Sequence, residues 1–225
     1  MKKIIYHGSV QQLEHPYFNG GKAHNDYGMG FYCTEEKEKA AEWAVGRGTD
    51  GWINMYEMDC DNLKILDLNA SEFCILHWLA VLLENRTFDV SYALAREARE
   101  YILRNFSVDY KHADIIIGYR ADDSYFSFAQ DFLSGAISYR QLNQAMHLGK
   151  LGCQFVLKSR ESFIRLRFLG AETALRDAWY PKRQKRDATA REEYFASRNQ
   201  RRRPDDLYVI QIIDPGITAN DPRLR

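Results

Sequence analysis

Two short motifs near the N-terminus carry residue types that can bind a ligand. In residues 6–9 (YHGS), an imidazole stands at the end of an apolar run beside a glycine, which lets a ligand approach the backbone closely. In residues 26–34 (DYGMGFYCT), two glycines let the chain turn tightly into a run that ends in an aromatic side chain. Taken alone, each motif also has a structural interpretation, namely a strand-end histidine and a turn before a core strand.

Two acidic residues follow a later apolar run. Residues 113–119 are nearly all apolar and β-branched, which predicts a buried strand, and Asp122 and Asp123 come just after it. Carboxylates at the end of a buried strand can hold a raised pKa and act as a general base. The alternative is that the pair caps the following helix. Asn85 and Arg86 close an earlier helix, where we expect either a solvated helix end or a contact with a phosphate.

Strands and helices must position these residues, and the hydrophobic patterns predict where they lie. Expected strands cover residues 2–7, 30–34, 52–58, 63–68, 113–119, 153–158, 162–169 and 207–213. Expected helices cover residues 71–85, 91–106, about 124–134 and about 138–148, with one more beginning at Thr34 as N-cap. The pattern is strand-rich at both ends and helical in the middle, which indicates the α+β class.

Composition excludes several classes of protein. The 225 residues are 45% hydrophobic, enough for a packed core, and 31 Lys and Arg balance 31 Asp and Glu. Disorder and a globally basic nucleic-acid binder are therefore not indicated. No apolar stretch approaches about 20 residues, so we expect no membrane span. No apolar run follows Lys2 and Lys3, so we expect no signal peptide. Four widely spaced cysteines predict reduced thiols in a cytoplasmic protein and no metal site.

Residues 176–203 differ in character from the rest of the chain. They hold ten Lys and Arg residues against four acidic ones. One interpretation is a solvated, mobile arm. The other is a surface for nucleic acid or an acidic partner, because clustered cations attract phosphates regardless of sequence. Four aromatic residues interleave with these charges and favour contact with bases: Trp179, Tyr180, Tyr194 and Phe195.

Together, the two N-terminal motifs and the segment with Ala-Ala-x-Trp that follows them resemble the ADP-ribosyltransferase superfamily. The resemblance is to the histidine–tyrosine–glutamate class, which includes the poly-ADP-ribose polymerases and diphtheria toxin. Within that class, the chain is similar to an uncharacterised bacterial domain family with YHGS, GFY-x-T, Ala-Asp-Asp and Gln-Phe motifs. The resemblance implies a split β-sheet core with a helical insertion over residues 1–170. Residues 171–225 would then be a basic excursion plus a C-terminal strand on the same single domain.

The resemblance also implies a binding site for NAD as co-substrate, with no metal. His7 would hydrogen-bond the adenosine-side ribose, and the Gly8 backbone would hold the nicotinamide carboxamide. Tyr32 would stack on the nicotinamide ring, Tyr27 would form a second wall, and Ser9 would contact the nicotinamide ribose.

The chain departs from this class at the catalytic position. The class carries a glutamate on a late strand, and the matching residue here is Gln154. A glutamine can hydrogen-bond the ribose, but it carries no negative charge and accepts no proton. Transfer of a single ADP-ribose is therefore expected rather than polymer extension. Asp122 or Asp123 is the expected replacement for the missing acid.

The function implied is that of a mono-ADP-ribosyltransferase that modifies a macromolecular acceptor, either protein or nucleic acid. By analogy with the superfamily, it would be a bacterial toxin or defence effector with an antitoxin or immunity protein as partner. Two alternatives stay open, namely an NAD glycohydrolase, in which water is the acceptor, and an inactive module that only binds NAD or ADP-ribose.

Overall fold

The computed structural model describes residues 1–120, 123–148 and 152–224, and for residues 123–125 the backbone only. Within these ranges the chain forms eight α-helices and two β-sheets, which confirms the α+β class. The chain divides into two compact units, each built from three segments. The first unit comprises Met1–Asp67, Asp109–Arg120 and Leu151–Asp187, and the second comprises Leu68–Val108, Ala121–Lys150 and Ala188–Arg225. The expectation of a single domain stays a prediction.

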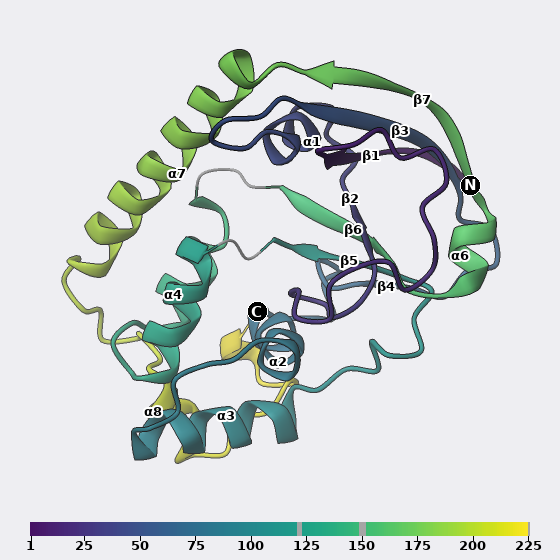
Figure 1. Ribbon diagram of the computed structural model, residues 1–225. Coiled ribbons are helices and arrows are strands. Elements are labelled where there is room, and N and C mark those ends of the chain that lie inside the picture. The colour runs from purple at the N-terminus through teal and green to yellow at the C-terminus, as the bar shows by residue number, and fades with distance from the viewer. Residues whose placement is uncertain (121–122, 149–151, 225) are drawn as a thin grey trace. The chain divides into compact units, whose positions relative to one another are not determined.

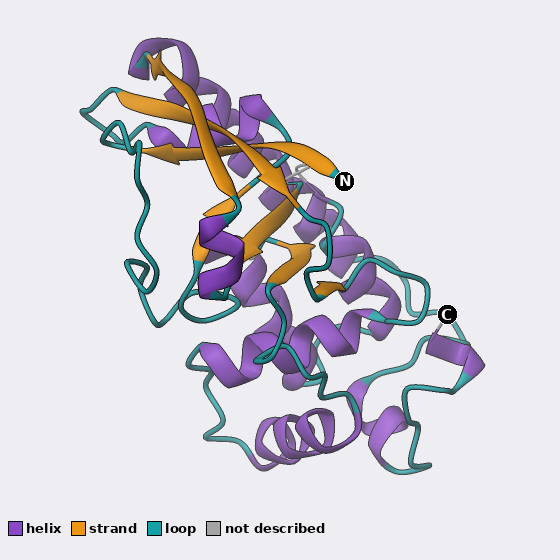
Figure 2. Ribbon diagram, turned by 90° about the vertical axis from the view of Figure 1, so that its right-hand side faces the viewer, coloured by secondary structure: helices purple, strands orange, loops and turns teal. Residues whose placement is uncertain are grey.

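All strands that lie in the described ranges belong to the first unit (Figures 1 and 2). An antiparallel three-stranded sheet has the order β1 (Lys2–Ser9), β3 (Gly51–Asp59), β7 (Leu166–Ala174). A four-stranded sheet has the order β2 (Phe31–Cys33), β6 (Cys153–Leu157), β5 (Ile115–Tyr119), β4 (Ile65–Asp67), and only β4 and β5 pair in parallel. A bridge between Tyr6 and Thr34 joins β1 to the end of β2, and with it the two sheets.

One hydrophobic core receives side chains from both sheets. Ile5 and Tyr56 enter it from the three-stranded sheet, and Phe155 and Leu157 enter it from β6. Successive side chains of a strand point to opposite faces, so Gln154 lies on the other face of β6. Because side chains alternate along β6, the apolar core lies on one face of the sheet and the candidate catalytic residue Gln154 lies on the other.

Helix α1 (Lys37–Ala44) packs on the face of the three-stranded sheet that lies away from this core. Ala40, Ala41 and Ala44 form a second cluster with Ile53 of β3, and Tyr6 of β1 packs against it. The small alanine side chains bring the helix backbone very close to β1. A Cβ at Gly8 would collide with the carbonyl oxygen of Ala40. The sequence predicted that a ligand approaches the backbone closely at Gly8, but in the structure helix α1 occupies that position.

The second unit is helical (Figure 1). Its helices are α2 (Ile75–Asn85), α3 (Ala93–Asn105), α4 (Asp123–Leu133), α5 (Tyr139–Ala145), α8 (Val209–Ile213) and the 3-10 helix η2 (Pro222–Leu224). Nine of the eleven residues of α2 are buried, so this helix supplies much of the unit's core. Within the described part of the chain, no helix is both long and apolar enough to cross a membrane.

The basic segment, for which a mobile arm was one interpretation, forms a helix of 23 residues, α7 (Arg176–Arg198). Its first part belongs to the first unit and the remainder to the second. The aromatic residues within it are mainly structural. Tyr194 is buried and stacks on Phe128 at 3.7 Å, and Trp179 and Tyr180 pack against the α1 cluster.

One predicted strand is wrong and another begins later than predicted, and local capping explains both differences. In place of the strand predicted over residues 207–213, the chain forms α8 (Val209–Ile213), in which the Gln211 side chain accepts a hydrogen bond from the Tyr208 backbone and so caps the helix. Residues 160–164 form the short helix α6 (Arg160–Ile164), because the Ser159 hydroxyl caps the amide of Ser162, and strand β7 begins only at Leu166.

The predicted N-cap of α1 is also wrong. Thr34 is held in the bridge to Tyr6, and its hydroxyl accepts from the amide of Glu36 at 3.1 Å. The helix therefore begins at Lys37, with Glu36 as its N-cap.

Replacement of Gly8 by alanine tests the packing of α1 on β1. Because the new methyl group would meet backbone atoms, we expect Gly8→Ala to lower the free energy of unfolding by about 1–3 kcal/mol. Gly48→Ala is the matched control, since a Cβ at Gly48 meets no atom within 4 Å. Denaturant titration of both variants measures the difference, and equal stability of the two would contradict this packing.

Candidate functional site

Four residues form a row across the two sheets, three of them from strands β1, β6 and β5 and one, Thr34, directly after β2. Tyr6 is bridged to Thr34, and Gln154 is paired with Gly118. Thr34 and Gln154 stand one residue beyond the recorded pair Cys33 and Phe155, so the register of β2 and β6 places them opposite each other. Residues in such a row project from the same face of a sheet. We call these four residues the Gln154 row.

Gln154 is the unusual member of this row. Its side chain is only 7% exposed, and its Oε1 atom has no hydrogen-bond partner among the described residues. A buried acceptor without a partner costs about 1–3 kcal/mol. Buried polar groups in folded proteins are nearly always paired, so this atom is a position at which a ligand or a water would be bound.

The predicted second wall, Tyr27, lies beside Gln154 but is 1% exposed. Its hydroxyl donates to the carbonyl oxygen of Tyr119 at 2.6 Å, and a Cβ at Gly118 would collide with that hydroxyl. Gly118 is therefore required because Tyr27 is inserted next to it. The burial of Tyr27 argues for a supporting role under the site and against a ring face open to a ligand.

The glycine loop that carries Tyr32 is held from two sides. The Tyr32 hydroxyl donates to the Gly28 carbonyl at 2.6 Å and accepts from the Tyr27 amide at 3.1 Å. The Lys158 ammonium donates to the carbonyls of Tyr27 and Met29, each at 2.5 Å. Burial lowers the pKa of Lys158 to about 8. These contacts fix the loop, and Tyr32 lies on the Gln154 face because it pairs with Val156, two residues along β6.

His7 is attached to the same strand through the backbone. Its Nδ1 lies 2.7 Å from the Tyr32 carbonyl oxygen, and its ring packs on Phe31 with 4.4 Å between centroids. Burial lowers the pKa of His7, and the hydrogen bond to Tyr32 opposes this in part, so the imidazole is neutral near pH 7. A carbonyl only accepts, so Nδ1 carries the hydrogen and Nε2 is left as an acceptor. Phe31 belongs to the core on the far side of β6 from Gln154, so the structure ties His7 to Tyr32 but does not bring its ring to Gln154.

Ser9, predicted to contact a ribose, takes part in a structural network around Asn54. The Ser9 hydroxyl donates to the Gln11 carbonyl at 2.5 Å and accepts from Asn54 Nδ2 at 3.0 Å. Asn54 is completely buried, and its Oδ1 also accepts from the Leu13 amide at 2.7 Å. The network anchors the chain that leaves β1. Sequence patterns did not single out Asn54, because one asparagine within a strand carries no recognisable motif.

Trp43 of α1, the tryptophan of the Ala-Ala-x-Trp segment, was not predicted as a site residue. Its indole Nε1 is buried and has no hydrogen-bond partner among the described residues. The guanidinium of Arg120 lies 4.5 Å from the centre of its ring. Arg120 directly follows β5, two residues beyond Gly118, which pairs with Gln154. The contact of Trp43 with Arg120 thus links its unpaired donor to the end of the strand next to Gln154.

A carboxylate stands at the start of β6. A Cβ at Gly152 would collide with Oε1 of Glu36, and Gly152 precedes Gln154 by two residues. This places Glu36, the N-cap of α1, next to the strand that carries Gln154. Of the acids predicted from the sequence, Asp122 and the side chain of Asp123 are outside the described residues, although Asp123 begins α4.

Other candidate residues have structural partners. Asn85 Nδ2 donates to the Val81 carbonyl at 2.8 Å, and Arg86 lies over the ring of Phe126 at 5.5 Å. The four cysteines form no disulfide. Among the residues with described positions, no group of His, Cys, Asp and Glu side chains could hold a metal ion.

Comparison with known proteins identifies a family. A family model described as a protein of unknown function (DUF3990) matches residues 3–168, a range that contains every residue of the Gln154 row, together with Trp43 and Glu36. No curated protein and no solved structure matches the chain.

The neutral, buried state of His7 predicts a pH dependence of stability. Because the folded pKa of His7 lies below 6.5, the unfolded chain binds more protons as the pH falls below 6.5. The difference in free energy of unfolding between wild type and His7→Gln should therefore be largest well above pH 6.5. It should decrease as the pH falls from 6.5 toward 5. Urea titrations of both proteins across this range measure the difference. A difference that is constant with pH would contradict the buried, neutral imidazole.

Proposed function

We propose that this chain, which belongs to the DUF3990 family of proteins of unknown function, binds NAD and cleaves its bond between nicotinamide and ribose. The ADP-ribose is then transferred to a macromolecular acceptor. NAD is a co-substrate in this proposal, and its binding site is the face of the first unit that carries the Gln154 row. A role as a toxin or defence effector, with an antitoxin or immunity protein, remains a prediction by analogy.

The observation that carries the proposal is the unpaired Oε1 of Gln154. It lies at the position where the resemblance to ADP-ribosyltransferases expects the group that bonds the ribose, and it is a buried acceptor without a protein partner. A ribose hydroxyl is a donor that would satisfy it. The unpaired indole donor of Trp43 adds a second polar atom and an aromatic surface of the kind that a nicotinamide ring binds.

The chemistry requires little of Gln154 beyond a hydrogen bond. When the glycosidic bond breaks, its electron pair leaves with nicotinamide, which becomes neutral, and positive charge develops on the ribose. An amide oxygen directed at the ribose 2′-hydroxyl stabilises that charge through its dipole. It does so less than a carboxylate would, which accords with transfer of a single ADP-ribose and not with polymer extension.

An acceptor nucleophile must lose a proton as it attacks the ribose. Glutamine cannot take that proton, so a carboxylate is needed. Glu36 stands beside Gly152 at the start of β6 and is exposed to solvent, so it can accept a proton and pass it to water. We therefore add Glu36 to Asp122 and Asp123 as a candidate general base.

The sharpest test is release of nicotinamide from NAD by Gln154 variants. Loss of a preorganised transition-state contact should lower the rate of Gln154→Ala by about 10²–10³-fold, with a much smaller change in NAD affinity. Gln154→Glu should retain or raise the rate. Gln184→Ala, an exposed glutamine of α7, is the control and should behave as wild type. In an assay of labelled ADP-ribose transferred to an acceptor, Glu36→Gln should lower the rate of transfer more than it weakens NAD binding.

The outcomes distinguish this proposal from its alternatives. Labelled ADP-ribose retained on a macromolecule supports a transferase, whereas nicotinamide release with free ADP-ribose indicates a glycohydrolase. Calorimetric binding of NAD without any nicotinamide release would indicate a binding module and contradict the enzymatic proposal. Neither binding nor release by the folded wild-type protein would overturn the NAD site altogether.

A further inference from the structure

Most of the basic side chains of α7 that have recorded contacts are neutralised by acids of their own unit. Arg186 pairs with Glu42 and Asp187, and Arg198 pairs with Asp131 at 3.1 Å. The positive charge of this helix is therefore partly compensated. A different situation exists just beyond its end, in the segment Arg201–Arg203.

The three consecutive arginines of Arg201–Arg203 are all exposed. Within the described part of the chain, none of their guanidinium groups has a recorded ion pair. Arg202 lies over the ring of Tyr208 at 4.8 Å, a contact that leaves its charge intact. The segment is thus a local concentration of uncompensated positive charge in a protein whose net charge is zero.

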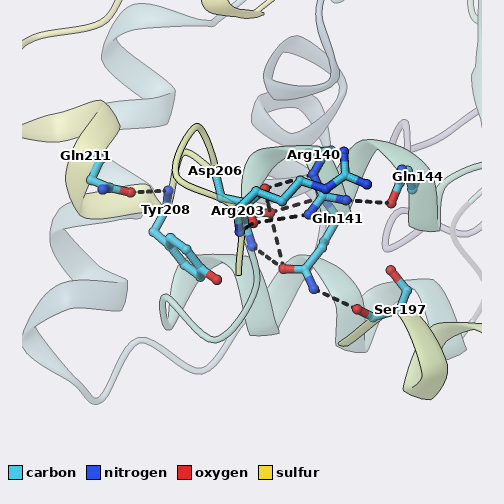
Figure 3. A network of polar contacts seen from close by, with 9 residues as sticks. Arg140, Gln141, Gln144, Ser197, Arg203, Asp206, Tyr208 and Gln211 are labelled. Atoms are coloured by element: carbon cyan, nitrogen blue, oxygen red, sulfur yellow. Dashed lines mark hydrogen bonds and ion pairs between the residues drawn. The ribbon is translucent and has the colours of Figure 1, made fainter. Parts of the chain in front are cut away.

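A buried polar network fixes the backbone of this segment (Figure 3). Asp206 is 5% exposed and accepts two hydrogen bonds from Arg140, at 2.8 and 3.1 Å. Its carboxylate also accepts from the backbone amide of Arg203 at 2.9 Å. Gln141 holds the end of α7 by donating to the Ser197 carbonyl at 2.8 Å. The arginine side chains therefore extend from a preorganised turn, not from a flexible tail.

An exposed aromatic side chain stands close to these arginines in sequence. Phe195, in the last turn of α7, is 57% exposed, whereas the adjacent Tyr194 is buried and bonded to Asp131. Exposed phenylalanine rings next to cations are the arrangement on which single-stranded bases stack, with their phosphates on the basic groups. An acidic peptide would use the charges but would have no use for the ring.

We propose that Phe195 and Arg201–Arg203 form a binding surface for single-stranded nucleic acid. The three guanidinium groups stand on consecutive residues, and their forked donors suit phosphate oxygens. The surface needs no NAD, so the proposal is independent of the proposed activity.

The test is binding of fluorescent single-stranded RNA and DNA oligonucleotides of 20 nucleotides, measured by anisotropy in the absence of NAD. Wild type should bind with a log–log salt slope of about −2 for three phosphate contacts, at about −0.7 each. Arg201→Gln with Arg203→Gln should weaken binding at least tenfold and reduce the slope by about 1.4. Phe195→Ala should weaken binding about fivefold or more without changing the slope.

The matched control is Lys182→Gln with Lys185→Gln, which removes two exposed charges from the first part of α7. We expect its affinity to stay within twofold of wild type. Equal losses in the two double variants would show non-specific attraction and overturn the proposal. Tighter binding of a polyglutamate peptide than of either oligonucleotide, or no binding by wild type at 50 mM salt, would also overturn it. Preference for RNA or for DNA identifies the nucleic acid and supports the proposal in either case.

Discussion

The two hydrogen bonds between Tyr6 and Thr34 determine the arrangement of the candidate site. The amide of Tyr6 donates to the Thr34 carbonyl at 2.8 Å, and the reverse bond measures 2.9 Å. Each is worth only about 0.5–1.5 kcal/mol in net stability. Yet they join the two sheets and align β1 with β2. This alignment adds Tyr6 and Thr34 to the row that contains Gln154 and Gly118. They also bring His7 to the carbonyl of Tyr32.

Two buried side-chain amides in the first unit differ in whether the protein itself supplies their hydrogen-bond partners. Asn54 accepts from Leu13 and donates toward His7, Ser9 and Gln11, so its burial is compensated by the protein itself. Gln154 is buried to a similar degree, but its Oε1 lacks a partner among the described residues. A fold that only required a packed interior would favour an apolar residue there, and our proposal assigns the unpaired Oε1 to a ribose hydroxyl.

The sequence predicted the elements whose patterns are strong and local. The strand at residues 2–7, the run 113–119 and the two central helices all appear close to their predicted bounds. Errors occurred where capping by one side chain decided the structure, as at Ser159 and Gln211, because β-branched runs such as residues 207–213 also suit a strand. The residues of the candidate site were predicted only in part, and their roles stay predictions. His7, Tyr32 and Gln154 came from motifs, whereas Trp43 and Glu36 became visible only through contacts between segments distant in sequence.

A crystal structure of the protein with NAD bound tests the central claim most directly, because it shows what satisfies the buried Oε1 of Gln154. We predict density for the dinucleotide on the Gln154 face, with a ribose hydroxyl within about 3.2 Å of Oε1. The nicotinamide ring should lie near the indole of Trp43. Ordered waters on both Oε1 and the indole nitrogen at saturating NAD, with no dinucleotide on this face, would contradict the account.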